Sequence, residues 1–299
     1  MRNFDDKLGV ADAAIISGDH GFISKISHLL TDAEISFIDF RKSQLDNDVI
    51  QAQENLKNCV ISSRNNKSRN HLLEARARME WGLLRFTQGE IEEAGVDLKW
   101  AMERMKVLSL GSATHGISIL NMAAWHVSRN ENIMALALLS EIDRNGPFPL
   151  EIISSSRLQI SQILFELGDF TSSQRHAWVS FQGFSSSDML DEAYQSAIIW
   201  LDLSVGNVTN ESQLMSTIVE NSKPRDIGEN HECQAHPDDV TEIIEWCTKY
   251  LNGDYSGGQR PDLLVLLDAE ESIGSDTVRQ SMLSVSNIED SELIKLLGC

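Results

Sequence analysis

Residues 75–104 read ARARMEWGLLRFTQGEIEEAGVDLKWAMER, and this stretch decides the fold. It consists of two amphipathic runs separated by the pair Gly89–Glu90. Glycine tolerates the left-handed backbone angles on which a helix most easily ends. The glutamate that follows falls near the positive end of the next helix dipole, where a negative charge is favourable. The stretch therefore predicts two helices, over 68–88 and 90–108, joined by a tight turn.

Similar breaks recur along the chain at a regular spacing. The anchor residues of the breaks are Asn47, Gly89, Asn130, Gly168 and Gly206, and consecutive anchors are 42, 41, 38 and 38 residues apart. Periods of this size indicate a solenoid of helical hairpins. The pattern predicts helices over 5–16, 21–44, 48–63, 68–88, 90–108, 113–129, 131–144, 149–167, 170–182, 187–205, 209–221, 237–252, 260–272, 275–285 and 288–297.

The helix after each anchor carries matched positions on one face, as a packing stripe requires. Mostly small residues stand five positions past the anchors, namely Ala52, Ala94, Ala135, Ser173 and Glu211. Mostly larger apolar residues stand nine positions past them, namely Leu56, Leu98, Leu139, Ala177 and Met215. Seven positions before the anchors stand Phe40, Gly82, Ala123, Ser161 and Ile199. Small residues there predict a close crossing of the two helices within a hairpin.

These positions resemble the tetratricopeptide repeat family. In residues 75–104 the resemblance rests on Trp81, Gly82, Phe86, Gly89, Ala94, Leu98 and Ala101. The stretch 116–142 keeps Ala123, Ala135 and Leu139, and the stretch 154–180 keeps Gly168, Phe170 and Ala177. The resemblance covers residues 30–220 and implies an all-α, right-handed superhelical solenoid of antiparallel helical hairpins.

This organisation predicts that the chain is divided into three segments. We expect a repeat array of this kind over 1–222 and an exposed linker over 223–236, where Pro, Gly, Asn and mixed charge interrupt the helical period. Residues 237–299 are expected to form a divergent helical cap, because an uncapped solenoid exposes apolar surface at its end. The amphipathic segment 288–297 either caps the array or docks into its groove.

Charge excludes two classes of partner. The chain of 299 residues has 45 acidic and 25 basic side chains and a net charge of −20. Such a charge repels nucleic acid and anionic membranes, which are bound through Lys and Arg. Residues 1–145 hold 20 acidic and 17 basic side chains, whereas residues 146–299 hold 25 and 8. The excess of acidic side chains in residues 146–299 either forms a solvated surface or attracts a basic partner.

The remaining bulk features favour the cytoplasm. The four cysteines are far apart, the N-terminus is polar and acidic, and no apolar run is long enough to span a bilayer. Motifs for hydrolases, zinc proteases, phosphate loops and dinucleotide binding are absent from the sequence. We therefore expect no enzymatic activity, no cofactor and no metal. The six tryptophans, spaced through the predicted hairpins, are expected to fill the core or the groove.

One local cluster leaves an alternative open. His231, Cys233 and His236, with Asp238 or Glu229 as a fourth ligand, offer the ligand types that zinc requires. The alternative is a polar loop from which Pro237, Asp238 and Asp239 begin the next helix.

The family resemblance implies that a ligand binds the concave face formed by the first helix of each hairpin. The corresponding residues are Arg41, Gln44, Arg76, Glu80, Leu83, Asn121, Gln159, Gln162 and Trp200. Basic and Asn side chains there can hold a peptide carboxylate, but this chain lacks a full basic set. We expect a scaffold or adaptor that binds a peptide or helix of another protein, and the acidic excess leaves a basic partner as one alternative. The alternatives are an effector-sensing regulatory module, a metal-dependent enzyme and self-assembly.

Overall fold

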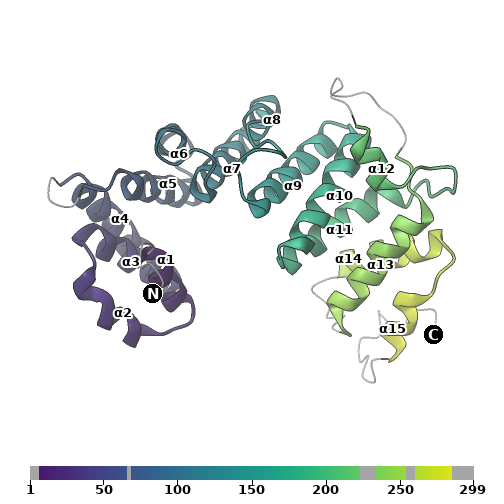
Figure 1. The fold of residues 1–299 in the computed structure, drawn as a ribbon, viewed down its shortest axis with the longest axis horizontal. Helices are drawn as coiled ribbons and strands as arrows, with labels where there is room; N and C mark the ends of the chain where they lie inside the picture. Colours follow the sequence, from purple (N-terminus) through teal and green to yellow (C-terminus); the bar gives the residue numbers. More distant parts are fainter. Residues whose placement is uncertain (1–6, 66–68, 223–232, 254–259, 285–299) are drawn as a thin grey trace. The chain divides into compact units, whose positions relative to one another are not determined.

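The computed structural model describes residues 7–65, 69–222, 233–253 and 260–284 (Figure 1). In these ranges the regular structure is helical, apart from a single parallel bridge between Val208 and Ala235. Backbone contacts divide the chain into two compact units, Met1–Phe148 (unit 1) and Pro149–Cys299 (unit 2), which are described separately. The all-α prediction is confirmed for the described residues. No described helix is both long and apolar enough to cross a bilayer.

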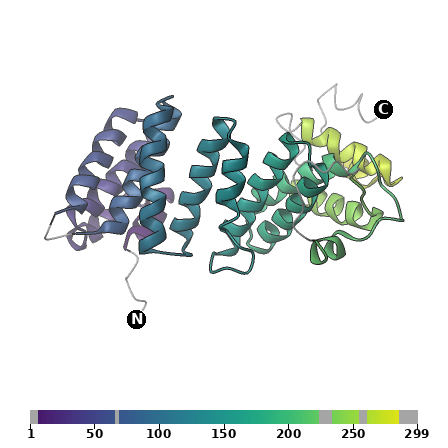
Figure 2. The ribbon, with the colours of Figure 1, turned by 90° about the horizontal axis from the view of Figure 1, so that it is seen from above.

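Unit 1 consists of helices that pack against their neighbours in sequence. They are α1 (Lys7–Ile16), α2 (His20–Ile26), the short 3-10 helix η1 (Ser27–Leu29), α3 (Asp32–Leu45), α4 (Val49–Ser63), α5 (His71–Thr87), α6 (Ile91–Leu108), α7 (Ala113–Ser128) and α8 (Asn132–Leu139). The pairs α3/α4, α5/α6 and α7/α8 form hairpins, and α4 packs on α5 as α6 packs on α7. Figure 2 shows the helices of this unit side by side.

The predicted helix ends are confirmed at the hairpin turns. Asn47, Gly89 and Asn130 have φ angles of 56°, 81° and 59°, and Gly168 in unit 2 has 81°. These are the left-handed angles on which a helix stops. Gly206, the fifth anchor, does not adopt such an angle, because α11 is followed by extended chain rather than by a tight hairpin turn.

The predicted packing stripe is also confirmed for four hairpins. Ala52, Ala94, Ala135 and Ser173 are at most 2% exposed, and Leu56, Leu98, Leu139 and Ala177 at most 1%. Gly82 permits the close crossing of α5 and α6, since a Cβ there would lie 2.9 Å from Cγ of Leu98. The fifth stripe fails at Glu211, which is exposed.

The single helix predicted over 21–44 is wrong, because the chain starts a new helix at Thr31. Leu30 is extended, with ψ of 146°. The Glu34 carboxylate accepts the backbone N–H of Thr31 at 2.7 Å, and the Thr31 hydroxyl accepts the backbone N–H of Glu34 at 3.3 Å. This reciprocal pair is a capping box, which satisfies two donors at a helix start.

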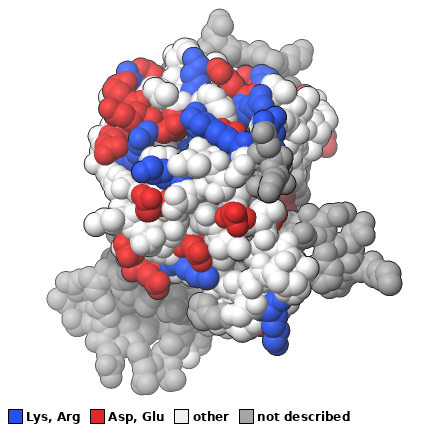
Figure 3. Space-filling model, turned by 90° about the vertical axis from the view of Figure 1, so that its left-hand side faces the viewer, with Lys and Arg blue, Asp and Glu red and all other residues white. Residues whose placement is uncertain are grey.

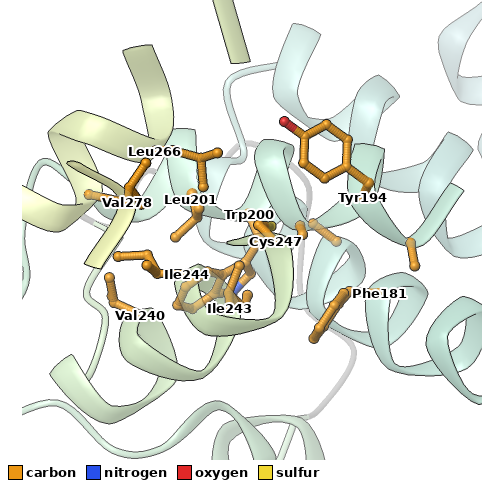
Figure 4. Packing of buried hydrophobic residues seen from close by; sticks show 14 of the residues in the cluster. Phe181, Tyr194, Trp200, Leu201, Val240, Ile243, Ile244, Cys247, Leu266 and Val278 are labelled. Atoms are coloured by element: carbon orange, nitrogen blue, oxygen red, sulfur yellow. The ribbon is translucent and has the colours of Figure 1, made fainter. Parts of the chain in front are cut away.

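Unit 2 has the helices α9 (Leu150–Glu166), α10 (Phe170–Ser186), α11 (Leu190–Ser204), α12 (Met215–Glu220), α13 (Pro237–Leu251), α14 (Arg260–Ser272) and α15 (Thr277–Ser284). Residues of α10, α11, α13, α14 and α15 share one apolar cluster (Figure 4). The described part of 237–299 therefore has a common core with α10 and α11. The predicted division into an array over 1–222 and a cap over 237–299 stays a prediction.

The helix predicted over 209–221 starts only at Met215. Before it, the Thr209 N–H donates to the Ala235 carbonyl at 2.9 Å, and the Ala235 N–H donates to the Asn207 carbonyl at 3.1 Å. Ala235 is fully buried, so the exposed linker expected over 223–236 does not extend to it. Residues 223–232 of that linker and the helix expected over 288–297 lie outside the described residues.

Candidate protein-binding surfaces

The predicted partner-binding residues fall on both units. Those on unit 1 come from α3, α5 and α7, and those on unit 2 come from α9 and α11. The first set, which we call the α3–α5–α7 surface, comprises Arg41, Gln44, Arg76, Glu80, Leu83 and Asn121. The second set comprises Gln159, Gln162 and Trp200.

The α3–α5–α7 surface joins the first helices of three consecutive hairpins, because α5 contacts both α3 and α7. The guanidinium of Arg76 lies 4.7 Å from the ring centroid of Phe37 on α3, a cation–π contact across the two helices. Nη1 of Arg41 donates to Oε1 of Gln44 at 2.6 Å. The guanidinium groups of Arg41 on α3 and Arg76 on α5 are thus both positioned by contacts with side chains of α3.

Leu83 and Asn121 supply an apolar and an amide group to the same surface. Leu83 packs in part on the buried cluster that contains Met79, Leu98 and Met122. Asn121 is half-buried, and its buried Nδ2 has no hydrogen-bond acceptor among the described residues. A buried amide without an acceptor costs about 1–3 kcal/mol.

The three predicted residues of unit 2 have different environments. Gln162 on α9 is exposed, whereas Gln159 is half-buried and its buried Oε1 accepts no hydrogen bond from the described residues. Trp200 is 0% exposed and its ring lies 5.2 Å from that of Trp178. The prediction that Trp200 faces a partner is therefore wrong. Trp200 belongs to an apolar cluster that also contains Ile243 of α13 and Leu266 of α14 (Figure 4).

The ionisable groups that are most strongly perturbed do not suit acid–base or nucleophilic chemistry. Burial, aided by the charges of Arg157 and Arg175, lowers the pKa of His176 to about 3. Burial raises the pKa of the Cys59 thiol to about 12 and also raises the pKa of Cys247. At neutral pH the imidazole is thus uncharged and both thiols are protonated, whereas a reactive cysteine needs a lowered pKa.

Of the residues considered as metal ligands, Glu229 and His231 lie outside the described residues. Nδ1 of His236 accepts the backbone N–H of Asp238 at 3.1 Å, so this ring caps the start of α13. Among the residues that the structure describes, no three His, Cys, Asp or Glu side chains form a group that could hold a metal ion.

Sequence reasoning missed a set of contacts between arginines and tryptophans in unit 1. The guanidinium carbons of Arg78, Arg85 and Arg129 lie 4.2, 5.0 and 4.7 Å from the ring centroids of Trp100, Trp81 and Trp125. Two of the pairs are four residues apart, a spacing that brings helical side chains together. Figure 3 shows a face on which Lys and Arg side chains lie among Asp and Glu side chains.

The comparisons with known proteins yield a structural likeness only. No protein-family model matches the chain, and no curated protein matches it. The crystal structure of BtubC (BKLC) from P. vanneervenii is similar over 97% of this chain and 95% of that chain. The TM-score is 0.41 and the sequence identity is 11%.

Proposed function

We propose that this chain is a tetratricopeptide-like helical scaffold whose α3–α5–α7 surface binds a segment of another protein. The observation that supports the proposal is the contact of α5 with both α3 and α7, since these three helices carry the cationic, apolar and amide groups of the predicted set. Arg41 and Arg76 supply positive charge, Leu83 supplies apolar area, and Asn121 supplies a buried amide donor that lacks an acceptor. Extended and helical segments are recognised by such combinations of anchors and backbone hydrogen bonds.

The repeat architecture of the proposal is supported by the hairpin turns and the buried stripe. The left-handed turns at Asn47, Gly89 and Asn130 recur at the spacing noted in the sequence, and each is followed by a buried small residue. Repetition of this kind aligns the first helices of successive hairpins, which is how helical repeat proteins build extended binding surfaces.

The test is a comparison of proteins captured from a native lysate by the wild-type chain and by the double variant Arg41→Glu, Arg76→Glu. Mass spectrometry is expected to find a protein that the wild type enriches and that the variant loses at least tenfold. Reversing the sign of a charge that contacts a partner changes attraction into repulsion, and juxtaposed like charges cost several kcal/mol.

A matched control makes this test specific. The variant Lys57→Glu, Lys99→Glu changes the net charge equally, but its exposed residues lie on α4 and α6, the second helices of the same hairpins. The control is expected to retain the captured protein. Equal loss with both variants, or equal retention, contradicts the proposed surface. Circular dichroism of each variant verifies that the helices are intact.

A cavity in unit 1 favours a second candidate function, the sensing of a small effector. The cavity has a volume of about 300 Å³ and lies between the α2–η1 segment and α3. Ile23, Leu30, Ile35 and Ile38 supply apolar walls, and polar groups at its edge include Asp39. A bound effector would change the scattering profile of the chain in solution. A profile that is unchanged by the metabolite pool of the native lysate speaks against this function.

A further inference from the structure

Unit 2 carries a continuous aromatic stack where α13 meets α10 and α11. Trp246 and Tyr250 lie one turn apart on α13, with ring centroids 5.6 Å apart and planes inclined by 8°. Tyr250 stacks on Tyr194 of α11 at 4.8 Å, and Phe181 of α10 meets Trp246 at 5.3 Å and 89°. We call these four residues the aromatic ladder. Phe181 and Tyr194 are buried, whereas Trp246 and Tyr250 are partly exposed.

Carboxylates flank the exposed rungs of the ladder. Oη of Tyr250 donates to Oδ1 of Asp191 at 2.5 Å. Glu242 stands one turn before Trp246 on α13 and accepts a hydrogen bond from Gln182 at 3.4 Å. Asp191 and Glu242 are both exposed. The hydrogen bond to Asp191, burial, and the negative charges of Asp191 and Glu192 raise the pKa of Tyr250 to about 12. The tyrosine is thus in a negative environment.

The three helices that form the ladder contain few basic residues, and Arg175 is the one Lys or Arg of α10. The sequences of α11 and α13 contain a single basic residue, Lys249, and its ammonium group lies 3.9 Å from Glu245. Within the described residues, no Arg or Lys side chain lies over the ring of Trp246 or Tyr250. The rings of Trp246 and Tyr250 therefore lie beside carboxylates without the stacked cation that such a combination attracts.

In unit 1, arginine side chains complete such combinations of an aromatic ring and a carboxylate. Arg85 lies with its guanidinium carbon 5.0 Å from the ring centroid of Trp81, and its Nη1 donates to Oδ2 of Asp97 at 2.6 Å. Arg129 lies over Trp125 in the same manner and pairs with Glu92 and Glu131. In both cases one guanidinium contacts a partly exposed tryptophan and a carboxylate together. The aromatic ladder presents the tryptophan and the carboxylates alone.

We propose that the exposed rungs of the aromatic ladder bind an arginine side chain of a basic segment in a partner protein. The guanidinium packs against the exposed part of Trp246 beside Tyr250, and its N–H groups donate to the carboxylate of Asp191 or of Glu242. Arginine fits better than lysine because its planar group stacks on an aromatic ring while it donates to a carboxylate. The excess of 25 acidic over 8 basic residues in 149–299 attracts such a segment from a distance.

This inference rests on the proposal that the chain binds protein segments, but not on the α3–α5–α7 surface. The probe is a fluorescein-labelled octapeptide that alternates arginine and serine, and its affinity for the full chain is measured by fluorescence anisotropy. An octapeptide with citrulline in place of arginine keeps the shape of the side chains and removes their charge. The arginine peptide is expected to bind and the citrulline peptide to lose binding by more than tenfold.

Two variants test the ladder itself. Trp246→Leu keeps apolar volume but removes the aromatic ring, and an exposed cation–π contact of about 0.5–1 kcal/mol predicts a two- to fivefold loss of affinity. Asp191→Asn, Glu242→Gln keeps hydrogen-bonding shape but removes two charges, and we expect about tenfold weaker binding. The control Asp202→Asn, Glu220→Gln removes two exposed charges elsewhere on α11 and α12, and we expect less than a twofold change.

The outcomes separate this inference from the proposed function. Arg41→Glu, Arg76→Glu is expected to leave the affinity for the arginine peptide undiminished, whether or not it loses the captured protein. Equal weakening by the ladder variant and the control would mean attraction by net charge alone and overturn the ladder site. Unchanged binding by Trp246→Leu, or equal binding of the citrulline peptide, would overturn it too. Thermal unfolding of each variant verifies that unit 2 is folded.

Discussion

Unit 1 and unit 2 are both helical, but different interactions hold their helices together. In unit 1 the charges nearly balance, and several carboxylates pair with a nearby cation, as Glu74 does with Arg64 and Asp97 with Arg85. The four described cation–π contacts also belong to this unit. In the described part of unit 2, Lys249 pairs with Glu245 and Arg279 pairs with Glu270, and hydroxyl contacts between helices are added to the apolar packing.

Buried serines give unit 2 its polar contacts. The hydroxyls of Ser161 on α9 and Ser173 on α10 lie 3.0 Å apart, and each also donates to the other's backbone carbonyl. The hydroxyl of Ser180 lies 3.0 Å from that of Ser196 on α11 and donates to the carbonyl of Ser154. Small hydroxyl side chains let helices approach closely and still satisfy their polar atoms. Three acidic residues of unit 2, Asp169, Asp239 and Glu270, are buried as well.

The largest expected effect comes from the core of unit 2. Trp200→Ala removes a fully buried ring, and a change of this kind costs about 3–5 kcal/mol. Hydrogen exchange followed by mass spectrometry should show faster exchange in α10, α11 and α13. The control Trp100→Ala in unit 1 removes a partly exposed ring that contacts Arg78, and it should cost far less. Equal losses would contradict the contrast between the two units.

A smaller loss is expected from close packing in unit 1. A Cβ at Gly95 on α6 would lie 2.4 Å from Cζ2 of Trp125, whose Nε1 donates to the Ile91 carbonyl at 2.7 Å. Gly95→Ala should displace this ring and lower the free energy of unfolding by about 1–3 kcal/mol, measured by urea denaturation. Val96→Ala changes a neighbouring side chain that is 69% exposed, and it should change that free energy by less than about 0.5 kcal/mol. A stabilised Gly95→Ala would refute the close contact.

The serine contacts of unit 2 are expected to contribute somewhat less. Ser180→Ala removes a buried hydroxyl that bonds to both α9 and α11, and the expected loss is about 1–2 kcal/mol. Ser186→Ala removes an exposed hydroxyl on the same helix, and it should be neutral or slightly stabilising because alanine favours the helix. The test compares the urea concentrations at which the Ser180→Ala and Ser186→Ala variants are half unfolded. Equal midpoints would mean that the buried serines serve only as small residues.

The smallest effect concerns pH. Burial raises the pKa of Asp239, although its carboxylate accepts the backbone N–H of Met215 at 2.9 Å. A raised pKa means that the folded state binds the proton more tightly, so this group stabilises unit 2 below its unfolded pKa. That contribution is lost as the pH rises through the folded pKa. Asp239→Asn keeps an acceptor without the charge, so its stability relative to wild type should be greatest above the folded pKa of Asp239 and should decline as the pH falls through that pKa, as measured by urea denaturation over a series of pH values. A relative stability that rises as the pH falls contradicts the raised pKa.

Local signals explain what could be predicted from the sequence. The ends of the hairpin helices follow from residues that tolerate left-handed angles, and the buried stripe follows from spacing on one helix face. The capping box at Thr31 and Glu34 was also present in the sequence, but the long apolar pattern over 21–44 obscured it. Within the α3–α5–α7 surface, the half-buried positions of Arg76 and Asn121 follow from the same helical spacing.

Contacts between distant segments explain what could not be predicted. Trp200 shares one helix face with Ala193, Ala197 and Ser204, all buried on α11, and the apolar cluster that it joins includes residues of α13 and α14 that are far away in the sequence. Ala235 lies in a polar stretch, yet the bridge to Val208 places it in the interior. The helical spacing places Trp200 on a packing face, but the segments that pack there and the burial of Ala235 depend on which distant elements meet.

The sequence by itself determined an all-helical chain, the turns of its hairpins and the acidic excess of its second half. Each of these depends on a residue and its near neighbours: backbone angles at Asn and Gly, the period of the helix, and the count of charges. Only the tertiary structure decided which tryptophans are buried, which arginines lie over aromatic rings, and that Trp246, Tyr250, Asp191 and Glu242 share one surface. Those features depend on packing between helices that are far apart in the chain.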